Sequence, residues 1–160
     1  MPQLRDFVNT WENEFRTSLR VFAAFPGERL EYRPHEVSKT ARDLMWVIAD
    51  EEREMVDGCL KGKFTWAARK APKTKEDLVR EYKKSHQELV KKVEKAGEDL
   101  FLKKLNFMVA KGKTGEVSGR DILWMMLHDQ IHHRGQLSVY LRLVGTKVPS
   151  IYGPSADEPW

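Results

Sequence analysis

Four long stretches of the chain place apolar side chains at intervals of three and four residues, the spacing that lines one face of an α-helix. They cover residues 4–22, 41–60, 74–97 and 118–144. A Pro26-Gly27 pair ends the first stretch, and Gly97 and Gly145 end the third and fourth. Four helices with one long connection predict an all-α chain that folds as an up-down four-helix bundle.

Polar residues that cap helices support these boundaries. Ser38 or Thr40 is the expected N-cap of the second helix, and Thr74 is the expected N-cap of the third. Between the third and fourth helices, residues 101–109 fit either a short helical turn or an extended segment, and residues 111–115 fit a loop.

Length and composition bound the class of protein. A chain of 160 residues, 41% hydrophobic and 32% charged, fits one domain, 1–160, with a core of its own. No apolar run approaches the ~20 residues that span a bilayer, and residues 1–6 lack the apolar core of a signal peptide. The single cysteine, Cys59, excludes an internal disulfide and suits a reducing compartment. We therefore expect a cytoplasmic protein that does not associate with membranes.

A basic segment separates the second and third helices. Between Leu60 and Glu76 the chain has six cations and no acidic residue: Lys61, Lys63, Arg69, Lys70, Lys73 and Lys75. Phe64 and Trp66 are interleaved with them, a composition that fits aromatic stacking on single-stranded nucleic acid. It fits equally a solvated loop whose two aromatic side chains cap the core. We favour the loop and expect no nucleic-acid partner.

Three of the five histidines lie close together in the fourth stretch, with a carboxylate beside them. Asp129 with His133, and His128 with His132, are spaced four residues apart, so the members of each pair point the same way from a helix and can share a divalent cation. At ~100° per residue, Asp129 and His133 fall in the apolar band of this helix, and the other pair is turned toward its edge. We expect Asp129 and His133 to face the centre of the bundle. The alternative for His128 and His132 is that they bind no metal and are hydrogen-bonded within the protein or exposed at its surface.

One carboxylate interrupts the inward stripe of the second helix. The apolar members of that stripe are Leu44, Val47, Ile48 and Met55. Glu51 lies among them, and a buried carboxylate is costly unless it is paired or bound to a metal. Glu51 is therefore a candidate third ligand, or a hydrogen-bonding group that orients His133. The alternatives are that Glu51 lies near a solvated end or pairs with an arginine.

Three other positions of the fourth helix carry expectations. Tyr140 lies on the face of His133, two turns later, and is a candidate catalytic proton donor; a buried tyrosine with a satisfied hydroxyl is the alternative. Arg134 falls on the opposite, polar side. Gly135 costs ~1 kcal/mol relative to alanine inside a helix, and we expect it to allow the close approach of a neighbouring helix.

The sequence His133-Arg134-Gly135-Gln136 resembles the end of the motif H-x-x-x-H-R-G-Q of the DinB/YfiT-like family. The segment 32–34 (Tyr-Arg-Pro) and the tail 148–158 are also similar to one branch of that family. The resemblance extends over nearly the whole chain and implies a four-helix bundle that depends on a divalent metal, such as zinc, nickel or manganese. It also implies a small-molecule substrate, a low-molecular-weight thiol as co-substrate, and a homodimer.

The resemblance also implies a ligand set, from which this chain departs at two positions. Asp129 stands where the family usually has a histidine, although related thiol-dependent isomerases are similar in pairing an acidic residue with the later histidine. The family commonly takes its first ligand from a histidine of the second helix, within a pattern like residues 44–49. Val47 occupies that place here and cannot bind a metal. Glu51, one turn later, is the substitute that the sequence offers.

Three functions follow from these features. A cation held by His133 and Asp129, helped by Glu51 or His128, would keep positions open for water and substrate and would lower the pKa of a bound thiol or water. The resemblance then implies thiol transfer to an electrophile, or hydrolysis. The second function is a non-catalytic bundle with a degenerate metal site that binds a ligand or forms a dimer, which Val47 favours. The third is nucleic-acid association through residues 61–75.

Overall fold

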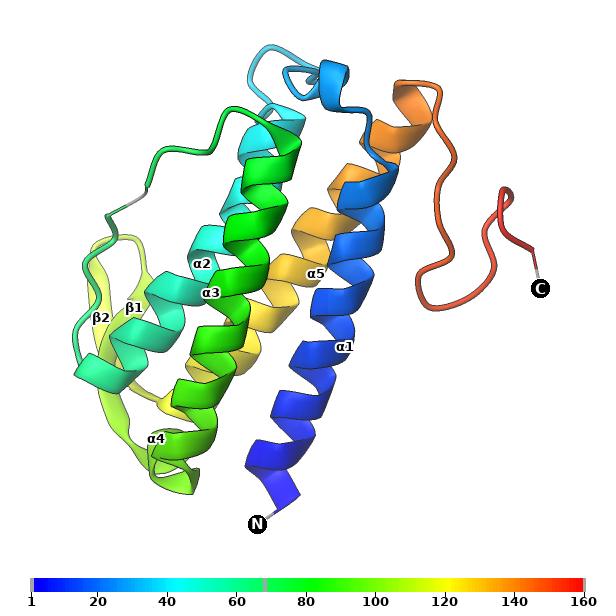
Figure 1. The fold of residues 1–160 in the computed structure, drawn as a ribbon. Helices are drawn as coiled ribbons and strands as arrows, with labels where there is room; N and C mark the ends of the chain where they lie inside the picture. The colour runs from blue at the N-terminus through cyan, green and yellow to red at the C-terminus, as the bar shows by residue number, and fades with distance from the viewer. Residues whose placement is uncertain (1, 68, 160) are drawn as a thin grey trace.

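Four long helices lie side by side in the computed structural model, which describes residues 2–67 and 69–159 (Figure 1). They are α1 (Pro2–Ala24), α2 (Ala41–Lys61), α3 (Lys75–Ala96) and α5 (Gly119–Leu143), and a short 3₁₀ helix, η1 (Gly27–Arg29), follows α1. α2 packs against α3 and α5, and α1 packs against the same two helices. None of the described helices is long and apolar enough to cross a membrane.

Side-chain caps set the starts of three helices. The hydroxyls of Thr40, Thr74 and Ser118 each accept a hydrogen bond from the backbone N–H of an aspartate three residues later. Thr40, rather than Ser38, is thus the cap of α2. At the other end of α2, Gly62 adopts the left-handed conformation, with φ of 76°, and its N–H donates to the carbonyl of Gly58. The helix boundaries predicted from the sequence are confirmed to within a few residues.

The prediction of an all-α chain is wrong in the connection between α3 and α5. This connection contains a short helix, α4 (Glu98–Leu102), and an antiparallel hairpin of β1 (Lys104–Ala110) and β2 (Lys113–Ser118). β1 alternates exposed and buried residues over its first half, and Leu105 and Phe107 join the core. This alternation is too short to distinguish a strand from a helical turn by pattern alone, and residues 113–115, predicted as a loop, belong to β2.

A buried carboxylate ties α1, α2 and α3 together. Glu52 is fully buried and accepts hydrogen bonds from Trp11 Nε1 at 2.8 Å and Tyr82 Oη at 3.3 Å. The Nδ1 atom of His86 lies 3.1 Å from Glu52 Oε2, and the His86 ring stacks on Phe15 at 3.7 Å. Three polar partners offset the desolvation of Glu52. No pattern in the sequence singled out Glu52 or His86.

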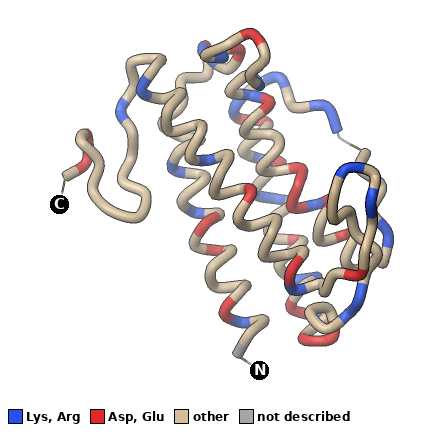
Figure 2. The backbone as a smooth tube through the Cα atoms, turned by 180° about the vertical axis from the view of Figure 1, so that it is seen from behind, with Lys and Arg blue, Asp and Glu red and all other residues tan. Residues whose placement is uncertain are grey.

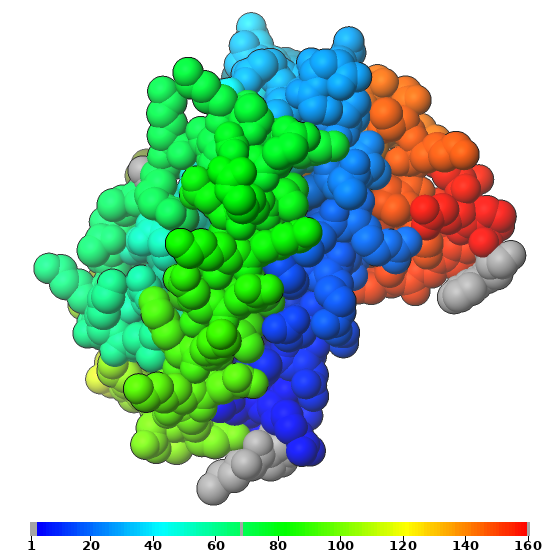
Figure 3. Space-filling model, viewed as in Figure 1, coloured from blue at the N-terminus to red at the C-terminus, as the bar shows by residue number. Residues whose placement is uncertain are grey.

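The C-terminal tail packs along α1 and α5 (Figures 1 and 3), and Arg134 anchors it. Arg134 is buried; its Nη2 atom lies 2.6 Å from Glu14 Oε2 and donates to Tyr152 Oη at 2.5 Å. The prediction that Arg134 lies on the polar side of its helix is therefore wrong, because α1 and the tail cover that side. The prediction for Gly135 is also wrong: this glycine is exposed, and a Cβ there would meet no atom within 4 Å.

Candidate functional site

Asp129 and His133 form a contact on the side of α5 that borders α2. His133 Nε2 lies 3.1 Å from Asp129 Oδ2, and the side chains are 16% and 45% exposed. The pair thus lies at the edge of the helix packing rather than at its centre. The Nδ1 atom of His133 is 3.0 Å from Gln136 Oε1. An oxygen acceptor at Nδ1 favours a proton there, which leaves Nε2 directed at Asp129.

The second histidine pair lies at the surface. His128 and His132 are both exposed. The ring of His128 lies 5.9 Å from that of Trp124, and His132 Nε2 lies 3.0 Å from Gln136 Nε2. Gln136 therefore contacts both His132 and His133 through opposite ends of its amide. The structure does not bring His128 and His132 to the carboxylates of α2.

Glu51 extends from α2 toward Asp129. Its Oε2 atom is buried and has no hydrogen-bond partner among the described residues. Burial, followed by the charge of Asp129, a hydrogen bond to Asp129 and the charge of Glu52, raises the pKa of Glu51 from 4.5 to about 9. Glu51 thus carries a proton at neutral pH next to an acceptor carboxylate. Glu51 faces Asp129 of α5, and the carboxylate that enters the core is that of its neighbour, Glu52.

A cavity of about 270 Å³ opens beside Glu51 and Asp129. Its walls are formed by Val47, Asp50, Glu51, Glu54, Met55, Trp66, Ala67 and Asp129. Val47, the position at which the resemblance implies a histidine, therefore borders the same cavity as both carboxylates. Apolar walls with a few convergent polar groups are typical of small-molecule sites.

The segment between α2 and α3 supplies the outer wall of this cavity. Trp66 is 49% exposed and has a positive φ of 54°, which is unusual for a residue with a side chain. Glu54 holds this conformation, because its Oε1 accepts the backbone N–H groups of Thr65 at 2.7 Å and Trp66 at 2.9 Å. From the sequence, Trp66 was expected to cap the core. Its role as a cavity wall was missed, because no local pattern predicts a chain that folds back onto α2.

Three of the six basic residues of this segment are held by contacts with the protein itself. Lys61 pairs with Asp57 at 3.3 Å, and Lys75 Nζ donates to the carbonyl of Phe25 at 2.8 Å. Arg69 donates to Asp50. The Lys and Arg positions of this segment and of the hairpin follow the outer loops of the molecule (Figure 2).

Tyr140 lies on the other side of the Asp129–His133 pair. Its hydroxyl donates to the carbonyl of Lys39 at 3.2 Å, and its ring packs against Tyr32. With His133 and Gln136 it borders a second cavity of about 330 Å³, which shares no lining residue with the Glu51 cavity. The structure therefore does not bring Tyr140 and Glu51 into one cavity.

The donors form two adjoining contacts rather than one coordination point. Within residues 2–67 and 69–159, no group of three or more His, Cys, Asp or Glu side chains is arranged to hold a metal ion. Glu51 faces Asp129, and Asp129 contacts His133. Val47 contributes no donor atom. Movement of side chains would be needed before one cation could contact all three donors.

The fold is similar to those of two solved structures. A DinB-like protein from Bacillus cereus ATCC 10987 aligns with a TM-score of 0.81 at 20% sequence identity, over 95% of this chain and 100% of that one. A DinB-like protein from Bacillus subtilis aligns with a TM-score of 0.74 at 21% identity, over 90% of this chain and 95% of that one. At identities this low, the structural similarity shows a shared fold and no more.

Sequence comparison extends the similarity. The uncharacterized protein YrdA of Bacillus subtilis (strain 168) is 46% identical over 37 residues, which are 23% of this chain and 22% of that protein's length. Residues 1–159 match the sequence profile of the DinB family. Since this match covers nearly all of the chain, the protein belongs to the DinB family.

Proposed function

We propose that Glu51, Asp129 and His133 bind a divalent cation and that the protein is a metal-dependent enzyme acting on a small molecule. The observation that carries this proposal is the buried, unpartnered Oε2 atom of Glu51 beside the Asp129–His133 contact. In the absence of a cation, a proton on Glu51 allows this carboxyl group to lie next to Asp129. A bound cation would satisfy the Oε2 atom.

The chemistry of the donors fits a cation such as zinc, nickel or manganese. Carboxylate oxygens and an imidazole nitrogen are ligands that these ions accept. Gln136 Oε1 lies 3.0 Å from His133 Nδ1, the arrangement in which a metal-binding histidine is oriented through its other ring nitrogen. His128 and His132, also proposed as ligands from the sequence, are exposed and suit a weaker surface site.

The reaction proposed is transfer of a low-molecular-weight thiol to an electrophile, or hydrolysis. A bound cation would supply Lewis-acid activation of a thiol or water. The chain itself contributes apolar walls, formed by Val47, Met55 and Trp66, beside the carboxylates. Tyr140 is proposed as a proton donor only for a substrate that enters through the His133 cavity, because Tyr140 lines that cavity and not the Glu51 cavity.

The proposal includes the state in which the protein acts. We propose that residues 1–160 form one domain, an up-down bundle of the four long helices, that works as a cytoplasmic homodimer. Met125, Val139 and Leu143 are 44%, 57% and 54% exposed on one face of α5. We propose that these side chains contribute to the contact between the two copies.

A second candidate function is a non-catalytic member that binds a small ligand in the Glu51 cavity. It is favoured by Val47, which removes a donor from that cavity, and by the separation of the remaining donors into two contacts. In this alternative Glu51 keeps its proton, and no cation enters at physiological concentrations.

Calorimetric titration of the protein with zinc, nickel and manganese tests the proposal. Glu51→Gln and His133→Ala each remove a donor and should weaken binding tenfold or more, whereas His128→Ala removes an exposed histidine and should change it little. Val47→His adds a donor to the same cavity and should strengthen binding. Binding that is unaffected by Glu51→Gln, or lost equally in His128→Ala, would contradict this assignment.

A further inference from the structure

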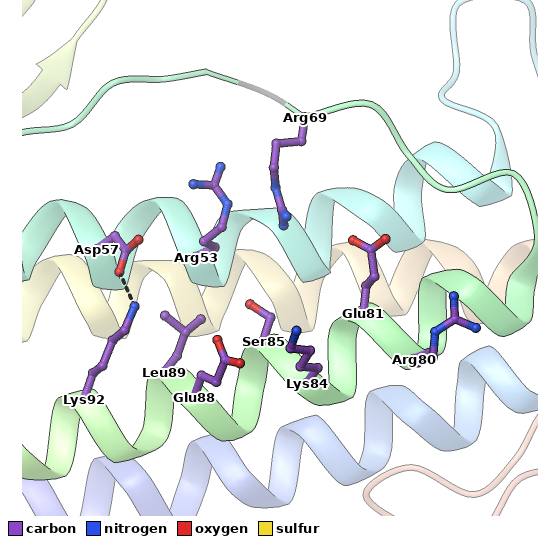
Figure 4. Close-up of a pocket in the computed structure, with 10 residues that line it drawn as sticks. All are labelled: Arg53, Asp57, Arg69, Arg80, Glu81, Lys84, Ser85, Glu88, Leu89 and Lys92. Atoms are coloured by element: carbon purple, nitrogen blue, oxygen red, sulfur yellow. Dashed lines mark hydrogen bonds and ion pairs between the residues drawn. The ribbon is translucent and has the colours of Figure 1, made fainter.

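We propose that a second site, the groove between α2, α3 and Arg69 of the segment that leads into α3, binds a small molecule through its phosphoryl group. The groove has a volume of about 680 Å³ and shares no lining residue with the Glu51 cavity. Arg53 enters it from α2 and Arg69 from the segment above (Figure 4). A pair of Lys92 and Asp57, joined at 3.0 Å, lies at one end.

The two arginines are held by the same atom. Arg53 Nε donates to Asp50 Oδ1 at 3.1 Å, and Arg69 Nε donates to the same oxygen at 2.6 Å. Because each guanidinium is fixed by its inner nitrogen, the outer Nη groups remain for a ligand. Among the described residues, none of these four Nη atoms has a hydrogen-bond partner; Arg53 Nη2 lies 3.8 Å from Glu54 Oε2.

The backbone of Arg69 is also held by hydrogen bonds, in addition to its side chain. Its backbone N–H donates to Asp50 Oδ2 at 3.0 Å, and its carbonyl accepts the Nε1–H of Trp46 at 2.8 Å. Its guanidinium also lies over the Trp46 ring, 4.9 Å from the centroid. A preformed guanidinium loses little conformational entropy when it binds a ligand.

Charge in this part of the groove favours an anion. Burial acts to raise the pKa of Asp50, but hydrogen bonds and charge from Arg69, and a hydrogen bond from Arg53, outweigh it and lower that pKa. Asp50 is therefore ionised and is shared by two guanidinium groups; Glu54, 3.8 Å from Arg53 Nη2, supplies a second and looser negative charge. Lys84 lies on the opposite wall and adds a third cation that makes no ion pair with a described residue (Figure 4).

The geometry of the donors selects the class of anion. Planar guanidinium forks match the oxygens of a phosphoryl group and bind it with two parallel hydrogen bonds. Two such forks side by side suit the adjacent phosphoryl groups of a pyrophosphate. Glu81 and Glu88 line the α3 wall and repel anions, so the phosphoryl group belongs on the Arg53–Arg69 side. The rest of the groove, which Ser85 and Leu89 line, is available to the organic part of the ligand.

Titration calorimetry with inorganic pyrophosphate, at constant ionic strength, tests the site. Arg53→Gln should weaken binding about tenfold or more, and Arg53→Lys should lose most of this affinity although it keeps the charge. Glu81→Gln should strengthen binding, because it removes a repulsive charge. Arg120→Gln removes an exposed arginine that does not line the groove and should leave binding unchanged.

Comparison probes distinguish the possible ligands. Weaker binding of inorganic phosphate than of pyrophosphate supports the use of both arginine forks. Absence of pyrophosphate binding at millimolar concentration, or equal losses in Arg53→Gln and Arg120→Gln, would overturn the proposal. Tight, steeply salt-dependent binding of a single-stranded oligonucleotide that pyrophosphate does not displace would also overturn it, in favour of a nucleic-acid surface.

Discussion

Glu51 and Glu52 are neighbours on α2, yet their carboxylates have opposite surroundings. Glu52 has three polar partners in the core, whereas the buried Oε2 atom of Glu51 has none among the described residues. A helix turns by ~100° per residue, so hydrophobic periodicity could place one of them inward but could not decide between them. The partners that decide it, Trp11, Tyr82 and His86, lie on other helices.

The raised pKa of Glu51 predicts how stability depends on pH in the metal-free protein. The native state binds a proton up to about pH 9, whereas the unfolded chain releases it near 4.5. The contribution of protonated Glu51 to the free energy of unfolding is therefore fully present below pH 4.5, and it is lost as the pH rises toward 9. Glu51→Gln should therefore raise the free energy of unfolding by about 1–3 kcal/mol at pH 8, and change it little at pH 4.

Urea unfolding in the presence of a chelator measures this effect, and Glu54→Gln is the matched control. Burial acts to raise the pKa of Glu54, but the N–H groups of Trp66 and Thr65 outweigh it and lower the pKa. The stability that Glu54 contributes is thus present above its unfolded pKa and lost on acidification, so Glu54→Gln should destabilise the protein at pH 8. Equal effects of Glu51→Gln at both pH values would contradict the assignment of a protonated Glu51.

At the level of elements, local signals in the sequence predicted the long helices well. Caps such as Thr40 and Thr74, and the glycine at 97, act on neighbouring residues and need no knowledge of the fold. The hairpin was missed, because its strands are stabilised by pairing with each other and by burying Leu105 and Phe107 against the helices. Such tertiary contacts leave little trace in a short segment.

Two glycines of α5 should respond oppositely to alanine. Gly135 is exposed in the helix interior with free space at its Cβ position, so Gly135→Ala should raise the free energy of unfolding by about 1 kcal/mol. A Cβ at Gly119 would overlap the carbonyl oxygen of Leu100, so Gly119→Ala should lower it by about 1–3 kcal/mol. Denaturant unfolding of both variants measures the difference. A loss of stability in Gly135→Ala would show that a contact covers this face in solution.

The segment between α2 and α3 is also held by defined contacts. Glu54 accepts the amides of Thr65 and Trp66, so Glu54→Gln should speed hydrogen exchange at these two amides while the helix amides keep their protection. Glu94→Gln changes an exposed glutamate of α3 and should leave the exchange of both amides unchanged. Unaltered exchange in Glu54→Gln would mean that other contacts hold this wall of the cavity.

Across the whole molecule, contacts between distant parts of the chain account for what the sequence could not predict. Arg134 is buried because Glu14 and Tyr152, from α1 and the tail, meet it there. α5 is apolar on most sides, so periodicity could not tell which polar side chains its neighbours cover. The spacing of Asp129 and His133 could predict their contact, because both lie on one helix. The cavity wall formed by Trp66 depends on how the chain folds back and had no local signal.

The central claim is that one cation joins Glu51 of α2 to Asp129 and His133 of α5. Anomalous diffraction from crystals of the protein soaked in zinc or manganese locates such an ion directly. We expect an anomalous peak within coordination distance of Glu51 Oε2, Asp129 and His133 Nε2, lost in crystals of Glu51→Gln. A peak only at the exposed His128 and His132, or none under conditions that saturate other zinc sites, would contradict the claim and favour a protein that binds its ligand without a metal.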